Sequence, residues 1–322
     1  MQAEESKLIT HHSSLVTGYY GLPVLKRPRW KWEIAVYFWT GGIAAGAYLI
    51  AAIADLFGDE HDRATVRLGR LLALPLVVAS AALLIKDLGR PEKFYNMLRI
   101  FKLKSPMSAG AWGLFVFGGF AGLSGLLEVL AAGDSLRRVR RLVGLLGAPF
   151  GLFLGGYTGV LISATAIPLW ARNRLLWGPT FIASAFSTGV AAIEALLALT
   201  GQGSGEALGK LDRVHRLGLT AEAALLAAGL ARLGSSGRPL MRGRWSSLFV
   251  PGALGVGLLL PLVLSLLPRR REARPGLTLL QATCVLVGGL IFRTCIVYTG
   301  KDSADDPGAY FAMTRRRNGR QQ

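Results

Sequence analysis

The stretch "LLIKDLGRPEKFYNMLRIFKLKSPMSAGAWGLF", residues 83–115, leaves one apolar run, crosses a Gly-Arg-Pro turn and enters a second apolar run. Eight charged residues gather between the two runs. The whole chain of 322 residues repeats this pattern, because 52% of its residues are hydrophobic, only 17% are charged and its mean hydropathy is positive. Long apolar blocks joined by charged turns predict an all-α polytopic membrane protein.

Eight apolar blocks are long enough to cross a bilayer as helices, at roughly 20 residues each. They cover residues 33–57, 68–86, 108–132, 142–165, 177–200, 208–233, 247–267 and 276–299. An even number of crossings places both termini on the same face. The expected organisation is an extramembrane segment over residues 1–32, a membrane domain over 33–300 and an extramembrane tail over 301–322.

The net charge of +18 raises the question of nucleic-acid binding, but the basic residues stand in loops such as "RRVRR" (137–141) and "RRREAR" (269–274). Such loops meet anionic lipid headgroups, so no nucleic-acid partner is expected. The loops on the face without the termini are short and dense in Arg, which is typical of the cytoplasmic side. We therefore expect a bacterial or archaeal cytoplasmic membrane protein with both termini on the extracytoplasmic face.

The chain offers few ligands for a resident redox cofactor. Cys284 and Cys295 lie in the last block without a CxxC or CxxCH motif, so neither an iron–sulfur cluster nor covalently attached haem is expected in this chain. Haem held between membrane helices needs pairs of histidines, and His215 is the only histidine within a span. The expectation is a haem-free chain without a metal site.

Ionisable side chains inside apolar blocks are costly and are therefore functional candidates. Placed by depth, Tyr37, Asp87, Tyr157 and Arg293 all fall toward the terminus-bearing face, where they could share a pocket. Arg293 lies well inside "LVGGLIFRTCIVYTG" and needs a partner, for which Asp87 is the first choice. Structural alternatives remain open: Tyr37 could belong to an aromatic belt, Tyr157 could be a packed ring, and Asp87 with Arg90 could stabilise a turn.

A second set of ionisable residues lies at mid-depth or nearer the other face: His215 and Glu222 in span six, Glu194 in span five and Glu128 in span three. His215 and Glu222 are seven residues apart, so they line the same side of one helix. The set could exchange protons along a path, or its carboxyl groups could simply hydrogen-bond between helices. For Glu128, near a helix end, the packing role is favoured.

Glycines mark where helices approach one another. Gly147, Gly151, Gly155 and Gly159 follow one another at a spacing of four residues, which gives span four one face without side chains. Such a face allows a neighbouring helix to pack closely. This row is interpreted as packing rather than chemistry.

Four motifs occur in order along the chain: "WEIAVYFWTGGIAAGAYL" (32–49), "DLGRPEKF" (87–94) followed by "SPMSAGAWGLF" (105–115), "GYTGVLISATAIPLW" (156–170) and "FRTCIVYTGKDSADDP" (292–307). Together they resemble the NrfD/PsrC family, the haem-free membrane subunits of respiratory oxidoreductases. The resemblance implies eight helices in two side-by-side four-helix bundles, with a quinone site near one face. It also implies docking of a four-cluster ferredoxin-like iron–sulfur subunit, which serves a molybdopterin catalytic subunit.

The resemblance also assigns residues. Tyr37, Asp87, Tyr157 and Arg293 match positions that the family associates with quinone binding or coupling, and Glu222 matches its acidic residue of span six. One departure concerns this helix. Members of the family often carry a second acidic residue two turns earlier, where this chain has a histidine at position 215. Proton coupling through span six is therefore an open question.

The expected function is quinone chemistry, with menaquinone or ubiquinone as the substrate. Tyr37 and Tyr157 would hydrogen-bond the headgroup, Asp87 would exchange its protons, and Arg293 would fix or tune that carboxylate. Electrons would pass to the docked subunit. The connection after span two would present its basic residues to that partner: Arg90, which also borders the quinone pocket, Lys93, Arg99, Lys102 and Lys104. The alternatives are a secondary transporter and a purely structural membrane anchor for such a complex.

Overall fold

The computed structural model describes residues 25–102, 104–130, 136–266, 275–306 and 310, and within these residues the chain forms helices and no strand. The expectation of an all-α fold is confirmed. Most of the predicted N-terminal segment and of the C-terminal tail lie outside the described residues, as do the loops 131–135 and 267–274.

Each of the eight predicted blocks forms a long helix whose ends differ from the predicted ones by up to five residues, since charged residues such as Arg63 and Arg137 belong to the first turn of their helices. The span after α9 is composite, since α11 (Ser246–Leu248) runs into a π-helical stretch, η6 (Phe249–Leu259), and then into α12 (Leu260–Leu266). The other long helices are α2 (Trp32–Phe57), α3 (Arg63–Asp87), α5 (Pro106–Leu130), α6 (Arg137–Ser163), α8 (Arg174–Thr200), α9 (Gly205–Leu233) and α13 (Pro275–Ala304).

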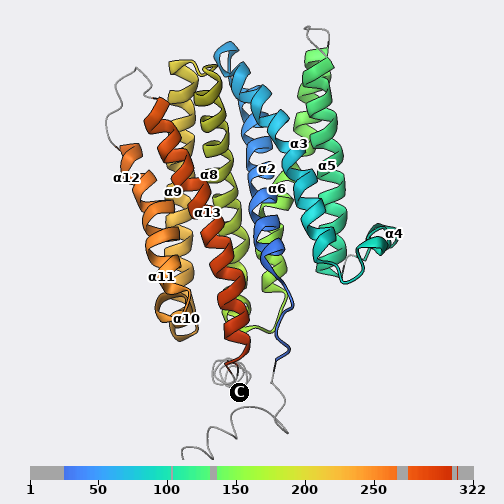
Figure 1. Ribbon diagram of the computed structural model, residues 1–322. Helices are drawn as coiled ribbons and strands as arrows, with labels where there is room; N and C mark the ends of the chain where they lie inside the picture. Colours follow the sequence, from blue (N-terminus) through green and yellow to red (C-terminus); the bar gives the residue numbers. More distant parts are fainter. Residues whose placement is uncertain (1–24, 103, 131–135, 267–274, 307–309, 311–322) are drawn as a thin grey trace, which may run out of the picture.

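The long helices form two bundles that lie side by side (Figure 1). α2, α3, α5 and α6 pack together in the N-terminal bundle, and α8, α9, α13 and the composite span pack together in the C-terminal bundle. α2 and α6 of the first bundle contact α8 of the second, and α2 also contacts α13. The start of α2 and the end of α13 lie at the same end of the molecule, at the bottom of Figure 1. We call this the terminus-bearing end.

Short elements connect the spans. η2 (Glu60–Asp62) precedes α3, and η3 (Pro91–Lys93) and α4 (Asn96–Arg99) lie between α3 and α5. α7 (Pro168–Arg172) precedes α8, while η5 (Gly234–Gly237) and α10 (Arg238–Arg242) follow α9. α5 and α13 both begin at a proline, whose fixed φ suits the first position of a helix.

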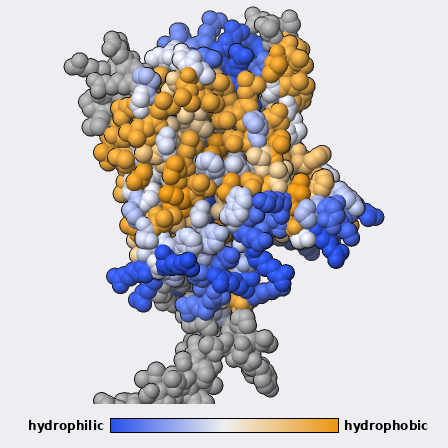
Figure 2. Space-filling model, viewed as in Figure 1, coloured by the Kyte–Doolittle hydropathy of each residue, from blue (hydrophilic) through white to orange (hydrophobic). Residues whose placement is uncertain are grey.

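The surface of the molecule fits a lipid bilayer. Figure 2 shows a band of apolar residues around the middle, with hydrophilic residues gathered at both ends. Seven of the described helices, counting the composite span, are long and apolar enough to cross a membrane. α9 is long enough to cross a membrane but has a more polar composition. Its polar residues His215 and Glu222 are buried against the rest of the bundle, and Leu217 is exposed.

Glycines hold the two bundles in direct backbone contact. A Cβ atom at Gly46 of α2 would lie 1.8 Å from the carbonyl oxygen of Ala185 in α8, and one at Gly189 would lie 2.4 Å from the carbonyl carbon of Gly46. The glycine row of α6 is also confirmed as packing. A Cβ at Gly147 would meet the ring of Tyr48, and one at Gly159 would meet the backbone of α8.

We expect Gly46→Ala to lower stability, because even a methyl group must push α8 away from α2. Overpacking of this kind costs about 1–3 kcal/mol. The matched control is Gly119→Ala in α5, where an added Cβ meets nothing within 4 Å and helix propensity improves. Thermal unfolding of the two purified variants in detergent checks the prediction, and equal melting temperatures would contradict it.

Candidate functional site

Two predicted tyrosines come together at the terminus-bearing end of the N-terminal bundle. Tyr37 of α2 and Tyr157 of α6 are both buried and interact electrostatically. The Tyr157 hydroxyl donates a hydrogen bond to the Pro106 carbonyl oxygen at the start of α5, and its ring occupies the space left by Gly110. The Tyr37 hydroxyl forms no hydrogen bond with any described residue, so it is available to a ligand.

Asp87 lies at the same end, beside the beginning of α2. It is the last residue of α3, is half-buried, and accepts a hydrogen bond from the backbone N–H of Lys31. A second carboxylate, Glu33, interacts with it electrostatically and lies one helical turn before Tyr37. Glu33 is buried, Lys86 lies 3.6 Å from its Oε1, and its Oε2 has no hydrogen-bond partner among the described residues. This end of the bundle therefore combines two carboxyl groups with two phenols.

Arg293 does not pair with Asp87, and the prediction that it does was wrong. Its guanidinium donates from Nε to the Phe38 carbonyl oxygen at 3.0 Å, and from a terminal nitrogen to Ser184 Oγ and the Gly289 carbonyl oxygen, each at 3.1 Å. The same group lies 5.7 Å from the centre of the Phe181 ring. It is 1% exposed, so these contacts take the place of water.

The physical reason for the error is depth. Asp87 contacts Lys31, just before the first residue of α2, whereas the Arg293 guanidinium packs against Gly42 of the same helix. Those two α2 positions are about 16 Å apart along the axis, at 1.5 Å per residue. Both residues lie toward the terminus-bearing end, as predicted, but at different depths along α2.

The charged partner of Arg293 is Glu222, from the set that the sequence placed elsewhere. The two groups interact electrostatically, and the hydroxyl groups of Ser184 and Ser187 of α8 face the Glu222 carboxylate. Ser184 therefore contacts both the acid and the guanidinium. Two turns earlier in α9, His215 Nδ1 lies 2.8 Å from Glu194 Oε2, and both residues are buried.

These contacts join Arg293 of the first predicted cluster to Glu194, His215 and Glu222 of the second in one polar network through the C-terminal bundle. It runs from Glu194 and His215 to Glu222, through Ser184 to Arg293, and ends on the carbonyl group beside Tyr37. The electrostatic interaction between His215 and Glu222 bridges the step along α9.

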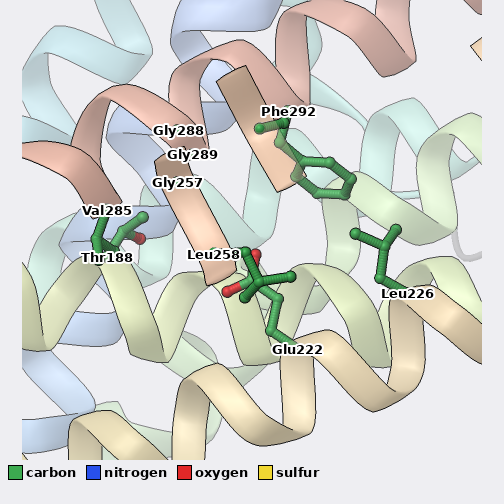
Figure 3. A pocket seen from close by; sticks show the side chains of 10 residues that line it. Thr188, Glu222, Leu226, Gly257, Leu258, Val285, Gly288, Gly289 and Phe292 are labelled. Atoms are coloured by element: carbon green, nitrogen blue, oxygen red, sulfur yellow. The ribbon is translucent and has the colours of Figure 1, made fainter. Parts of the chain in front are cut away.

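A small cavity lies beside Glu222, and Leu226, Leu258 and Phe292 also line it (Figure 3). Its volume is about 10 Å³, at the lower limit for a single water molecule. η6 forms part of its wall, where Gly257 meets Gly288 of α13 backbone to backbone. π-Helical turns often occur at functional sites. The π-helical turns of η6 beside Glu222 therefore support a functional role for this carboxyl group.

Glu128 lies at the opposite end of the N-terminal bundle, in an ion-pair cluster that the sequence did not predict. Arg70 of α3 is 2% exposed and donates to Glu128 Oε1 at 2.5 Å and to Asp55 Oδ2 at 2.8 Å. Arg140 of α6 lies 3.7 Å from the second Glu128 oxygen. The cluster joins all four helices of the bundle, so the predicted packing role of Glu128 takes the form of ion pairs.

Next to this cluster, Asp59, His61 and Glu206 lie close together at the surface. Lys210 already supplies a cation there, since its Nζ lies 2.7 Å from Asp59 and 3.0 Å from Asp62. The hydrogen bond from Lys210 holds the pKa of the exposed Asp59 carboxyl below its ordinary value. This surface group is explained as a lysine-centred ion-pair network.

The predicted docking residues all lie on the connection between α3 and α5. Arg90, Lys93, Arg99, Lys102 and Lys104 are exposed there. Figure 1 shows that this connection, with α4, stands out sideways from the N-terminal bundle. A role for these residues in protein docking stays a prediction.

Three important residues gave weak signals in the sequence. Glu33 stands in the first turn of a helix, where an acidic residue is common because it complements the helix dipole. Arg70 follows the start of its apolar block so closely that it reads as part of a basic loop. Ser184 is a small polar residue of a kind that membrane helices often carry. Only their contacts show what they do.

Comparison with known proteins decides the family. A family model described as "Polysulphide reductase, NrfD" matches residues 25–302. The chain belongs to the NrfD family. It is 31% identical to a polysulfide reductase subunit of Wolinella succinogenes, over 84% of this chain and 94% of that protein. It is also 27% identical to protein NrfD of Escherichia coli (84% and 95%) and 24% identical to a protein NrfD homolog of Haemophilus influenzae (84% and 94%).

The range that the NrfD model matches contains the polar network and also Glu33, Tyr37, Asp87 and Tyr157, which we call the terminus-bearing cluster. The sequence resemblance to this family is therefore confirmed over the whole membrane domain. The similarity to the relatives also extends over almost their full length, so it does not rest on one local motif.

We expect Arg70→Gln to destabilise the N-terminal bundle, because it leaves Asp55 and Glu128 close together without their shared cation. Removing one partner of a buried ion pair costs about 3 kcal/mol or more. Arg67→Gln is the matched control, since Arg67 lies one turn earlier on α3 and is exposed. Thermal unfolding of both variants tests this, and a melting temperature for Arg70→Gln equal to that of the control would refute it.

Proposed function

We propose that this chain is the membrane subunit of a respiratory oxidoreductase complex and that it binds a quinone or quinol at the terminus-bearing end of the N-terminal bundle. Family membership and the name of the Wolinella relative, a polysulfide reductase subunit, support the first part. The observation that carries the second part is the cluster of Glu33, Tyr37, Asp87 and Tyr157 at the edge of the apolar band, in which Glu33 keeps a carboxylate oxygen without a hydrogen-bond partner among the described residues.

A quinone suits this cluster because its ring is apolar while its two oxygens need hydrogen-bond donors and acceptors. The free hydroxyl of Tyr37 can donate to a quinone oxygen, and Tyr157 lies next to it. Oxidation of a quinol releases two electrons and two protons, and Asp87 and Glu33 are positioned to accept the protons. Reduction of a quinone is the reverse. Menaquinone and ubiquinone both fit this chemistry.

The electrons would pass to a partner docked at the terminus-bearing end, which we propose to be a four-cluster ferredoxin-like iron–sulfur subunit. A molybdopterin subunit would carry out the terminal reaction on the far side of that partner. In this arrangement the membrane chain needs no haem or iron–sulfur cluster of its own. The loops at the other end are dense in Arg, which is typical of the cytoplasmic side. We therefore propose that both termini face the extracytoplasmic side of a bacterial or archaeal cytoplasmic membrane.

Arg293 would couple this site to the polar network. The guanidinium binds the carbonyl group of Phe38, the neighbour of Tyr37 in sequence, and faces Glu222 on its other side. A change of charge or hydrogen bonding at the quinone would therefore alter the electrostatic interaction between Arg293 and Glu222. Glu222, His215 and Glu194 form the proposed path for protons, and a second possibility is that they only hold α8 and α9 together.

We expect Asp87→Asn to lower quinol turnover of the assembled complex by about 10²-fold, because the amide keeps its size but accepts no proton. Glu92→Gln is the matched control, since Glu92 is an exposed acid five residues away on the following connection. Turnover with a water-soluble quinol analogue is the measurement. Unchanged turnover in Asp87→Asn, or turnover insensitive to quinone-analogue inhibitors, would favour the structural-anchor alternative.

Glu222→Gln should separate electron transfer from proton movement. The amide can still accept hydrogen bonds from Ser184 and Ser187 but cannot release a proton. In complexes reconstituted into vesicles, we expect quinol turnover to persist while the number of protons moved per turnover falls. Glu206→Gln, at an exposed position early in α9, should leave both values unchanged. If the proton count stays normal in Glu222→Gln, the network has only a packing role.

A further inference from the structure

The connection between α3 and α5, residues 88–105, has an unusual position. It leaves α3 after Asp87, forms η3 and α4, and returns to α5 at Pro106. Figure 1 shows that α4 lies beside the N-terminal bundle rather than over its end, and that α13 reaches further down than this connection. The wall from which it projects is the lipid-facing side of α5, where Phe115, Leu123 and Leu126 are exposed.

The connection is held in this position by α5. The backbone N–H of Lys102 donates to Ser108 Oγ at 3.0 Å, and the same hydroxyl donates to the Ile100 carbonyl oxygen at 3.2 Å. The Phe101 ring meets the Trp112 ring edge-on, with 5.9 Å between the ring centres. These contacts fasten the returning part of the connection to the first turns of α5, so its sideways projection is a built feature.

Its exposed side chains are of two kinds. Phe94, Tyr95, Ile100 and Phe101 are between 42% and 58% exposed, which is a large apolar area for so short a segment. Around them stand five exposed cations, Arg90, Lys93, Arg99, Lys102 and Lys104, against one acid, Glu92. Aromatic residues beside Lys and Arg are typical of the boundary between hydrocarbon and headgroups.

The level of the connection matches that boundary. Trp32, the first residue of α2, is exposed, and Lys86 near the end of α3 lies 4.6 Å from the centre of its ring. This aromatic–lysine pair marks the membrane interface on the neighbouring helices. The connection begins two residues after Lys86 and projects from there over the area that lipid must occupy.

We propose that the connection between α3 and α5 binds the surface of an anionic lipid bilayer. Phe94, Tyr95, Ile100 and Phe101 enter the headgroup region, and the surrounding cations pair with lipid phosphates. This goes beyond the proposed quinone chemistry and does not depend on it. Asp87 is the last residue before the connection. Lipid binding by the connection would therefore also hold Asp87 in position beside Glu33 and Tyr37.

A protein partner is the competing occupant for these cations. It would explain the charges, but not why four large apolar side chains project sideways, next to the lipid-facing wall of α5. Lipid explains both observations with one surface. The positive charge selects anionic headgroups, since each cation near such a surface contributes about 1 kcal/mol.

The test places a single new cysteine, Tyr95→Cys, in the full chain and labels it with an environment-sensitive fluorophore. Cys284 and Cys295 are buried, and the chain without Tyr95→Cys measures their background labelling. The protein is reconstituted into nanodiscs of phosphatidylcholine with increasing phosphatidylglycerol. We expect blue-shifted emission and quenching by lipids that carry a nitroxide close to the headgroup.

The charges are tested in the same labelled chain. Lys102→Gln should lower the affinity of the connection for the anionic surface about fivefold, the equivalent of one lost cation, and so move half-maximal quenching to a higher phosphatidylglycerol fraction. Joint replacement of Lys93, Arg99, Lys102 and Lys104 by Gln should abolish the effect. The control replaces Arg29, Arg232, Arg238 and Arg242, exposed cations away from the connection, and should change nothing.

Two results would overturn the proposal. One is strong quenching of the fluorophore by aqueous iodide in nanodiscs of every lipid composition, which would mean that the connection is exposed to water. The other is protection of the label only when the iron–sulfur partner is added, which would assign the cations to protein docking. Failure of quinone turnover in these variants has no bearing on either readout, so the two proposals fail separately.

Discussion

A guanidinium group inside a lipid-embedded bundle has no water to bind, so the protein must supply every contact, and Arg293 uses three helices to do so. From α13 it reaches a carbonyl oxygen of α2 and a hydroxyl of α8, while Glu222 of α9 balances its charge. This requirement fixes the helices around it. It also places a buried charge between the Phe38 carbonyl group, next to Tyr37 in the sequence, and the acid of Glu222, and the proposed coupling depends on that placement.

The sequence predicted the helices, and it singled out the ionisable residues inside them because a charge in an apolar run is visible without any structure. Tyr37 and Tyr157 do lie together, and Arg293 is buried. The pairings were not predictable. Position along a span gives depth only coarsely, so Arg293 and Asp87 were placed at one level, and a pairing also needs the rotation of each helix about its axis. Arg293 was therefore assigned to Asp87 rather than Glu222.

The two ends of the N-terminal bundle use charge in different ways. At one end Arg70 is paired with Asp55 and Glu128, and its neighbours complete a balanced cluster that joins four helices. At the other end Glu33 keeps an oxygen without a hydrogen-bond partner among the described residues, beside Asp87. An ion-pair cluster with balanced charges resists a change of protonation, whereas a carboxyl group with a spare acceptor atom can take up a proton. The chemistry is therefore expected where the charges are least satisfied.

The seam between the bundles has no side chain between α2 and α8 where Gly46 meets Gly189. In alternating-access carriers one half rotates against the other while the side chains between them repack. Between α2 and α8 the backbones are in direct contact at Gly46 and Gly189, so no side chains are there to repack. We therefore expect a signal to cross the seam as shifted protons and electric field rather than by repacking of side chains.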